Sequence, residues 1–343
     1  MFMGFSMIDR ADIVVGLAWG DEAKGKVTNQ LASREVGGKK YYDFVARWNG
    51  GSNAGHTIYV GDNCYKTHII PCGVFHGIKS IIGPNCVLHP ESFYKELDMI
   101  SSAGFDTSLV KVSPNTHIVT DNHIDEDKRT LSKKLGTTSR GIAPAYSAKA
   151  ARVGLLAKDV LEYDHIWDGN IHGNILCEGA QGIWLDINKG IYPYVTSSET
   201  LPYSACSIGF PTQVIDRVYG AAKIYDTRSG EDPLFPSTLL NDPILKSIAD
   251  VGEEYGVTTG RRRKVNWLDL NRLISAINIS GSTDVIINKC DILQEVGVYK
   301  LFYNEELLDF SGIEDITKFV EERIRVMCRF VSVVTFSYSP LFV

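Results

Sequence analysis

The chain has 343 residues, of which 44% are hydrophobic and 22% are charged. This composition is typical of a folded globular protein and excludes a disordered or low-complexity one. Its 35 basic and 41 acidic residues give a formal net charge of -6. That charge argues against a protein that coats nucleic acid or a membrane surface.

The seven cysteines are scattered and form no Cys-x-x-Cys pair, which favours a reduced, intracellular protein without a zinc site. No apolar run reaches the ~18 residues that a membrane span needs, and the first ten residues do not form a secretory signal. We find no internal repeat and no flexible linker. The sequence therefore predicts one soluble, cytoplasmic domain over residues 1–343, with no nucleic-acid or membrane partner.

Apolar runs typical of buried strands alternate with helical stretches along the chain. The expected strands are residues 12–17, 44–46, 175–177, 284–287 and 330–336. Apolar positions three and four residues apart predict helices at 265–279 and 313–327. Strands that alternate with helices predict an α/β fold with a mostly parallel central sheet covered by helices.

The first expected strand runs directly into a glycine-rich loop. Gly20-x-x-x-x-Gly25-Lys26 matches most of a phosphate-binding loop, in the strand–loop–helix context that such a loop requires. Val27 stands where a Mg²⁺-binding Ser or Thr belongs, which argues against a standard NTPase loop. Asp21 inside the loop therefore becomes the candidate metal ligand. Taken alone, an ordinary tight turn explains this segment equally well.

A second small-residue turn follows the second expected strand. It spans residues 47–57 and contains a glycine pair, Asn53 and, directly after Gly55, His56. A histidine in such a turn suggests an exposed hydrogen-bond donor that faces a phosphate.

Further loops combine glycines with hydroxyl groups. Residues 136–146, with Arg152 nearby, and residues 178–182, which lead to 192–198, suit a phosphomonoester. Each one alone is also explained by plain turn chemistry. The run 256–264 concentrates four cations beside two threonines and suits capture of a carboxylate or phosphate, with a solvated surface as the alternative.

Taken together and in this order, the motifs WGDEAKGK, GGSNAGHT, GTTSRGIAPAY, EGAQG with YPYVTSS, and TTGRRR resemble the adenylosuccinate synthetase family. The resemblance extends from about Asp12 to Asp291. In that family a nucleoside triphosphate activates the 6-oxo group of a purine monophosphate, and L-aspartate displaces the resulting phosphate. The resemblance implies a ligase that forms a C–N bond, uses Mg²⁺ with ATP or GTP, and acts as a homodimer.

The resemblance also implies roles for individual residues. The catalytic residues would be Asp21, as the base at purine N1, with Lys24, His56 and Gln181. Asp21 and the Gly55 carbonyl would hold the metal.

The implied binding residues form three sets. The substrate nucleotide would be held by Asn53, Thr137, Thr138, Ser139, Arg152, Gln181, Thr196 and Ser229. In a homodimer, Arg152 would reach the site of the partner. Aspartate would be bound by Thr259, Arg261 and Arg263. The nucleoside triphosphate would contact Gly20, Glu22, Ala23, Lys24, Gly25, Lys26, Gly55, His56, Thr57, Lys289 and Asp291.

Two kinds of departure from the family pattern bear on the substrates. Asp291, in the N-K-x-D pattern that reads guanine, supports GTP, but the usual G-P-x-R segment is not recognisable at 336–340, so ATP stays open. Ser139, Ser229 and the run 201–206 replace the residues usual near the purine nucleotide.

These replacements favour dGMP as substrate, as in short phage-encoded members of the family. A serine hydroxyl such as that of Ser139 can hydrogen-bond the exocyclic amine, which a glycine side chain cannot do. The product would be 2-amino-2′-deoxyadenylosuccinate, for 2-aminoadenine DNA, in host cytoplasm if the protein is phage-encoded. The alternative is IMP, giving adenylosuccinate for AMP biosynthesis, and retention of Asp21 keeps that alternative open.

Two other functional classes, a switch protein and an inactive binding protein, fit the sequence less well. A GTP-dependent switch protein would need a Ser or Thr in place of Val27. A catalytically inactive binding protein would not need Asp21, Lys24 and His56, which are all present.

Overall fold

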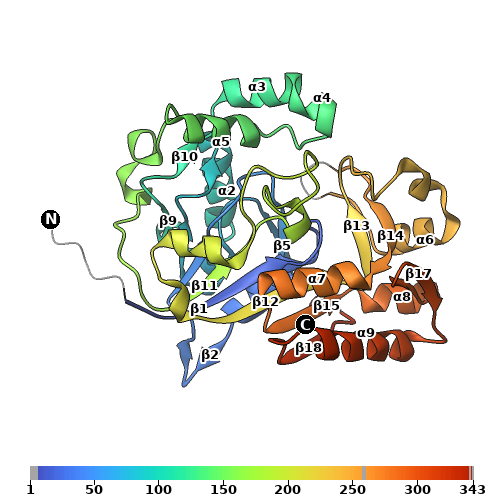
Figure 1. Cartoon of the computed structure of the whole chain (residues 1–343). Helices are drawn as coiled ribbons and strands as arrows, with labels where there is room; N and C mark the ends of the chain where they lie inside the picture. Colours follow the sequence, from blue (N-terminus) through green and yellow to red (C-terminus); the bar gives the residue numbers. More distant parts are fainter. Residues whose placement is uncertain (1–6, 257–259, 340, 342–343) are drawn as a thin grey trace.

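An eight-stranded sheet runs through the centre of the computed structural model, which describes residues 7–256, 260–339 and 341 (Figure 1). Every neighbouring pair of its strands is parallel. In spatial order the strands are β18 (Val333–Phe336), β15 (Asp284–Asn288), β12 (Ile215–Lys223), β1 (Met7–Gly16), β11 (His172–Glu178), β4 (Phe44–Arg47), β7 (Lys79–Ile82) and β9 (Val110–Val112). The predicted α/β fold with a mostly parallel sheet is confirmed.

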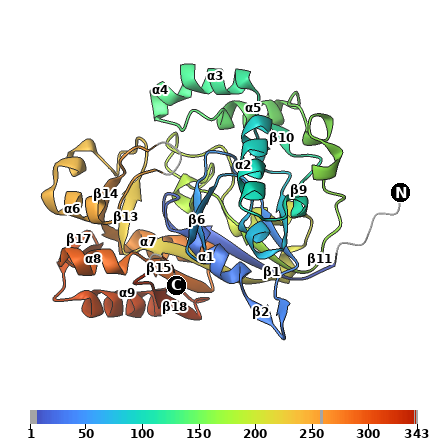
Figure 2. The same cartoon turned by 180° about the vertical axis from the view of Figure 1, so that it is seen from behind.

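Helices cover both faces of this sheet. The helices of the described residues are α1 (Lys24–Ala32), α2 (Pro90–Ser102), α3 (Asp121–Arg129), α4 (Leu131–Leu135), α5 (Ile142–Ala151), α6 (Pro243–Val251), α7 (Leu270–Ser280), α8 (Cys290–Val296) and α9 (Ile313–Met327). Helix α7 lies in front of the sheet in Figure 1, and α1 and α2 lie in front of it in the opposite view of Figure 2.

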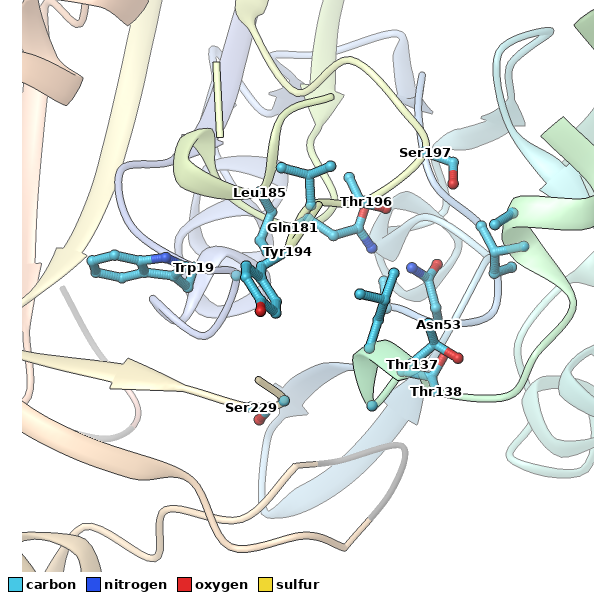
Figure 3. A pocket seen from close by; sticks show the side chains of 18 of the residues that line it. Trp19, Asn53, Thr137, Thr138, Gln181, Leu185, Tyr194, Thr196, Ser197 and Ser229 are labelled. Carbon is cyan, nitrogen blue, oxygen red and sulfur yellow. The ribbon is translucent and has the colours of Figure 1, made fainter. Parts of the chain in front are cut away.

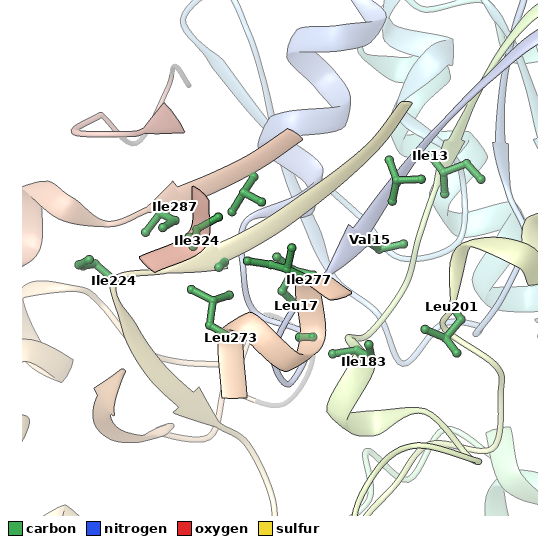
Figure 4. Packing of buried hydrophobic residues seen from close by; sticks show 14 of the residues in the cluster. Ile13, Val15, Leu17, Ile183, Leu201, Ile224, Leu273, Ile277, Ile287 and Ile324 are labelled. Carbon is green, nitrogen blue, oxygen red and sulfur yellow. The ribbon is translucent and has the colours of Figure 1, made fainter. Parts of the chain in front are cut away.

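Alternating side chains of β1 enter two different hydrophobic clusters. Ile13 and Val15 pack with Ile277 of α7 and with residues of α9 (Figure 4). Val14, which points to the other face, packs with residues of α1 and α2. Because successive side chains of a strand point to opposite faces, this central strand is buried on both sides.

The sequence prediction of a helix at 265–279 is wrong in its first third. Lys264–Asp269 forms strand β14, which pairs with β13 (Tyr225–Arg228) in an antiparallel ladder. Helix α7 begins only at Leu270, where the Asp269 side chain accepts a hydrogen bond from the backbone N–H of Arg272 at 3.0 Å. Apolar spacing runs through this junction without a break, so the spacing alone does not locate the cap.

The other predicted elements fare better. The helix at 313–327 is confirmed as α9, and four predicted strands coincide with β1, β4, β11 and β15. The fifth, β18, begins at Val333 rather than at Phe330. Four smaller sheets complete the described fold. In one of them, β13 and β14 are joined by β16 (Lys300–Tyr303) and β17 (Glu306–Asp309). The other three are two-stranded and pair β5 (His56–Val60) with β6 (Asn63–Thr67), β2 (Glu35–Val36) with β3 (Lys39–Lys40), and β8 (Val87–Leu88) with β10 (His117–Ile118).

The strand order changes direction around β1. The chain first builds β4, β7 and β9 on one side, then returns to insert β11 between β1 and β4, and finally adds β12, β15 and β18 on the other side. In parallel sheets, ligands bind at the carboxyl ends of the strands where such a change occurs. The loops that follow β1, β4 and β11 are therefore the expected place for a site.

One core position and one surface position of α7 provide a matched test of this packing. Ile277 is 1% exposed and Ile279 is 42% exposed on the same helix. Ile277→Ala should lower the free energy of unfolding by about 2–5 kcal/mol, since it leaves a cavity between α7 and the sheet. Ile279→Ala should change it by less than ~0.5 kcal/mol in urea denaturation. Equal effects would contradict the assigned faces of α7.

Candidate active site

A cavity of about 400 Å³ lies where the loops after β1, β4, β11 and β13 meet helix α4 (Figure 3). This volume is within the range of small-molecule sites. The implied site residues that line it are Gly20, Asp21, Asn53, Gly55, His56, Thr137, Thr138, Gln181, Thr196, Ser229 and Arg261. Motifs more than two hundred residues apart in sequence therefore meet at one cavity.

Glu22 fixes the loop after β1 from inside. Its Oε1 accepts hydrogen bonds from the backbone N–H groups of Ala18 and Gly20, at 3.0 and 2.7 Å. Its Oε2 pairs with Lys24 Nζ at 2.7 Å, and the same ammonium donates to the Gly20 carbonyl at 3.0 Å. Both side chains are buried, and breaking such a pair costs about 3–5 kcal/mol. Glu22 and Lys24 thus set the shape of the loop.

The loops after β1 and β4 touch at a glycine. A Cβ on Gly25 would lie only 2.9 Å from the Cβ of His56, so any larger residue would push the two loops apart. Ala23, at the N-cap of α1, has a φ of 66°. Gly20 and Asp21, just before this helix, line the cavity, so the positive end of α1 lies beside it.

Three buried polar side chains meet at the carboxyl ends of β4 and β11. Glu178 Oε1 lies 2.5 Å from both Arg47 Nη2 and His56 Nδ1. Glu178 Oε2 accepts the backbone N–H of Cys72 at 2.9 Å. His56 Nδ1 also lies 2.8 Å from Arg47 Nη2, which can only donate, so the two contacts of Nδ1 call for opposite tautomers. We assign the hydrogen to Nδ1 because its contact with the carboxylate, which can only accept, is the shorter one.

The burial of this group fixes its charge state. Burial, together with the charge of Arg47, lowers the pKa of His56 to about 4. Burial alone would raise the pKa of Glu178, but Arg47 and His56 outweigh it and hold this pKa well below its usual range. At neutral pH the group therefore contains a carboxylate, a guanidinium and a neutral imidazole.

A second buried network of charged side chains contacts Asp21. Arg263 forms ion pairs with Asp21 at 2.9 Å and with Glu254 at 2.6 Å. Glu254 also accepts hydrogen bonds from Lys223 at 2.8 Å and from the Tyr225 hydroxyl at 2.7 Å. Burial raises the pKa of Glu254, but the two cations outweigh it and lower the pKa to about 2. Glu254 is therefore ionised and holds Arg263 against Asp21.

The loop that carries Thr137 and Thr138 is hydrogen-bonded to Asp127, a buried aspartate of α3. Asp127 accepts hydrogen bonds from the Thr137 hydroxyl at 2.7 Å and from the backbone N–H of Gly141 at 2.9 Å. Arg261 Nη1 donates to the Gly136 carbonyl at 3.0 Å. These contacts place Thr138, between the two anchored ends, on the cavity wall.

Two residues that line the cavity each carry a buried side-chain oxygen without a hydrogen-bond partner among the described residues. These oxygens are Oε1 of Gln181, whose backbone φ is 58°, and Oγ of Ser229. Leaving a buried polar atom unpaired costs about 1–3 kcal/mol, so a ligand that pairs with them gains this energy.

Two implied nucleotide-binding residues do not line the cavity of their own chain, and for Arg152, which was expected to reach the site of a partner, this contradicts nothing. Ser139 does not line this cavity: it lines a second, polar one, and its hydroxyl donates to Ser132 Oγ at 2.8 Å. Its φ of 56° turns the chain there. Arg152, at the C-terminal end of α5, is exposed and is also not among the lining residues of the first cavity.

The residues implied for the triphosphate are divided between two places. Gly20, Gly55 and His56 line the cavity, whereas Lys26, Thr57, Lys289 and Asp291 are not among its described lining residues. Thr259, implied for aspartate, lies outside the described residues.

The C-terminal segment packs against this second group. Lys26 Nζ donates to Ser337 Oγ at 2.8 Å and to the Ser339 carbonyl at 2.9 Å. Burial lowers the pKa of Lys26 to about 8. The Asn288 amide donates to the Glu22 carbonyl at 2.9 Å, so the N-K-C-D segment supports the loop after β1.

Sequence reasoning assigned no role to Arg47, Glu178, Asp127 or Glu254. For Arg47 and Glu178 a signal was present, since each is the charged residue that ends a buried strand, β4 and β11. A charge at the carboxyl end of a buried parallel strand predicts a site residue. Asp127 and Glu254 lie in polar stretches, where nothing separates a buried carboxylate from an exposed one.

The metal site expected at Asp21 was tested against the donors present. No group of three or more His, Cys, Asp or Glu side chains in the described ranges could hold a metal. Mg²⁺ in phosphoryl-transfer sites needs only one or two carboxylates, because water and substrate phosphates complete its shell. The carboxylate of Asp21, which lines the same cavity as Gly55 and pairs with Arg263 through one oxygen, fits that requirement. Over the same ranges, no helix is both long and apolar enough to cross a membrane.

The low pKa of His56 leads to a testable dependence of stability on pH. The unfolded imidazole takes up a proton below pH ~6.5, whereas the folded one resists it until about pH 4. The free energy of unfolding should therefore fall as the pH is lowered through this window, by about 2 kcal/mol from this group between pH 7 and pH 5. His56→Gln should remove that share in urea titrations, and an unchanged difference between the two pH values would contradict a buried neutral His56.

Comparisons with known proteins identify the family that this chain is similar to. A sequence model described as adenylosuccinate synthetase matches residues 13–171 and 169–306. The adenylosuccinate synthetase of Thermoplasma volcanium is 36% identical, over 93% of this chain and 84% of its own. That of Brevibacillus brevis is 38% identical, over 87% and 82%.

Two solved structures are similar to this one. The fully ligated adenylosuccinate synthetase of Plasmodium falciparum has a TM-score of 0.79 at 27% identity and covers 96% of this chain and 97% of its own. The succinoaminodeoxyadenylate synthetase of cyanophage S-2L, bound to dGMP and dATP, has a TM-score of 0.74 at 20% identity, covering 97% and 93%. The latter shows a shared fold alone. Together with the family match, the comparisons establish that this chain belongs to the adenylosuccinate synthetase family of ligases that form a C–N bond.

Proposed function

We propose that this ligase joins L-aspartate to C6 of a purine nucleoside 5′-monophosphate and that its preferred nucleotide is dGMP. The observation that carries the preference is the pair of buried, unpartnered oxygens, Gln181 Oε1 and Ser229 Oγ, of two residues that line the cavity. The 2-amine of guanine offers two N–H donors, whereas hypoxanthine carries only a C–H at this position, and in both bases N1–H goes to Asp21. A 2-amino-6-oxopurine can therefore pair with both oxygens.

The distribution of polar side chains around the cavity indicates how the nucleotide is oriented in it. Asn53, Thr137 and Thr138 lie together on one side in Figure 3, and Trp19 lies at the opposite side, with Gln181 between them. Hydroxyl and amide groups suit the 5′-phosphate, joined in the proposal by Thr196 and by Arg152 of a second copy. The base then extends toward Gln181.

The chemistry begins at Asp21. A purine 6-oxygen is a poor nucleophile until N1 loses its proton, and the Asp21 carboxylate on the cavity wall is the proposed acceptor of that proton. The 6-oxygen then takes the terminal phosphoryl group of the triphosphate, and the amino group of aspartate displaces the phosphate from C6.

His56 and Lys24 are the proposed donors to the phosphoryl group in transit. With the hydrogen assigned to Nδ1 beside Glu178, Nε2 of His56 carries none while the imidazole is neutral. The negative charge of an entering phosphate raises the pKa of His56, and Nε2 gains the proton that it donates. Such donors stabilise charge that develops in the transition state.

Two arginines are proposed for aspartate. Arg261 lines the cavity, and Arg263 is fixed beside Asp21 by Glu254. Two guanidinium groups match the two carboxylates of aspartate in charge and in forked geometry.

The phosphoryl donor is proposed to be ATP or GTP, with Mg²⁺. Asp21 and the Gly55 carbonyl would hold the metal, which when bound neutralises charge on the phosphates. Lys289 and Asp291 would contact the donor's base, and Asp291 favours guanine.

IMP is the second candidate nucleotide. It is supported by the relatives at 36% and 38% identity, which are adenylosuccinate synthetases, and by the presence of Asp21. The two candidates share every chemical step and differ only at the 2-position of the base and at the sugar.

A panel of four nucleotides decides between them. IMP, dIMP, GMP and dGMP are assayed for aspartate-dependent phosphate release with Mg²⁺ and either ATP or GTP. We expect the kcat/KM of dGMP to exceed that of IMP by at least ~10-fold, and GMP to be poorer because its 2′-hydroxyl finds no partner. If IMP is preferred by ~10-fold or more, this is an adenylosuccinate synthetase of AMP biosynthesis and the dGMP proposal is wrong.

Matched serine variants locate the preference in the same assay. Ser229→Ala should reduce the ratio of dGMP to IMP by at least ~5-fold, since it removes one acceptor for the base. Ser139→Ala removes a hydroxyl that does not line this cavity and should leave the ratio unchanged. If Ser139→Ala lowers the ratio and Ser229→Ala does not, Ser139 rather than Ser229 recognises the 2-amine.

Asp21→Asn tests the catalytic base. The variant should fold, since Asp21 is not in the core, and should lose at least ~10²–10⁴-fold in kcat. Activity within a few-fold of the wild type would contradict the assignment.

The same variant tests the proposed dimer. Arg152→Ala and Asp21→Asn chains should each be nearly inactive, but their equal mixture should regain about a quarter of wild-type activity, because half of the dimers then contain one intact site. A mixture no more active than its parts would place Arg152 outside the site.

A further inference from the structure

One buried carboxylate outside the cavity is engaged in an unusual way. Glu96 lies on α2 and is 7% exposed. It accepts hydrogen bonds from three consecutive backbone N–H groups, those of His68 at 3.0 Å, Ile69 at 3.3 Å and Ile70 at 2.9 Å. Consecutive N–H groups that converge on one anion form a nest, which normally binds an external anion. Here the acceptor is a carboxyl group of the protein itself.

Residues 68–70, whose N–H groups form this nest, are connected to the cavity through two hydrogen bonds of His68. Its imidazole Nδ1 donates to the Ala54 carbonyl at 2.8 Å. Its own carbonyl accepts a hydrogen bond from Arg47 Nη1. Ala54 and Gly55 line the cavity, and Arg47 pairs with Glu178. The orientation of His68 thus bears on both sides of the loop after β4.

The far end of the same segment is fixed by the other buried carboxylate. Cys72, which begins the short 3₁₀ helix at Cys72–His76, donates its N–H to Glu178 at 2.9 Å. Residues 68–72 are therefore held between Glu96 and Glu178. Burial raises the pKa of Glu96 to about 7, although the three N–H groups act to lower it. A buried carboxyl group without hydrogen-bond partners is costly in either charge state, so neither end can shift without leaving buried polar groups unpaired.

We propose that Glu96 is a positioning residue for catalysis, which acts through His68 to hold residues 53–56 in their productive geometry. Glu96 itself is not among the described residues that line the cavity. Residues 53–56 carry the groups proposed to meet both phosphates, and a displacement of about 1 Å at such groups can cost ~10²-fold in rate. The inference rests on the ligase activity of the family and not on the choice of dGMP, because any accepted monophosphate reports on it.

The test is Glu96→Gln, assayed with whichever monophosphate the wild type turns over. The glutamine has the same size, but its NH₂ group faces backbone N–H donors, so the nest loses one of its two acceptors. We expect kcat to fall at least ~10-fold while the KM for aspartate stays within ~2-fold, since Arg261 and Arg263 lie on another segment.

Glu91→Gln is the matched control. Glu91 lies on the same helix, is exposed and pairs with Lys95. This substitution should leave kcat within ~2-fold of the wild type, as a surface change does. An equal loss in both variants would overturn the proposal, and so would a Glu96→Gln variant that keeps wild-type kcat.

A double-mutant cycle separates positioning from a general loss of stability. His68→Ala removes the contact with Ala54 and should lower kcat like Glu96→Gln, while the double variant should be little worse than either single one. Additive losses would show that Glu96 does not act through His68. If Glu96→Gln does not fold, Glu96→Asp keeps the carboxyl group and should show a smaller loss in kcat with an unchanged KM for aspartate. An effect of Glu96→Asp on the KM for aspartate alone would equally overturn the proposal.

Discussion

The site depends on a charge that the fold cannot leave unpaired. Glu178 ends the strand inserted beside β1, is fully buried, and is held by Arg47 from β4, by His56 from β5 and by the N–H of Cys72. Removing one partner of such a group costs about 3–5 kcal/mol. The loops after β4 and β11 and the turn before Cys72 are thus fixed relative to one another before any ligand binds.

Internal ion pairs play the same part elsewhere around the cavity. Glu22 occupies N–H groups of the loop after β1, and Glu254 holds Arg263 beside Asp21. These pairs keep the cations of a highly charged site at fixed positions while no phosphate or carboxylate is present. Preorganised charges need no rearrangement at the moment of reaction, which is a major source of catalytic power.

The motifs could be found from the sequence because their residue types are tied to backbone geometry. Glycines such as Gly25 are required where two loops touch, and such requirements repeat at fixed spacing. The alternation of apolar, strand-type runs with helical stretches likewise predicted the parallel sheet. The start of α7 was missed because Val265 and Trp267 fit the apolar spacing of a helix as well as that of a strand. Long-range partners such as Glu96 and His68 carry no local signal at all, since only the folded chain brings them together.

Ser139 and Ser229 show the limit of reasoning from substitutions in a motif. Both are hydroxyls in segments that the family resemblance brings to the nucleotide, and the sequence gives no ground for separating them. In the folded chain a positive φ turns Ser139 toward Ser132 and a different cavity, while Ser229 stays on the wall with its oxygen unpaired. Of the two, only Ser229 therefore retains hydrogen-bonding capacity that a nucleotide in the first cavity can use, and the backbone conformation rather than the residue type decides the difference.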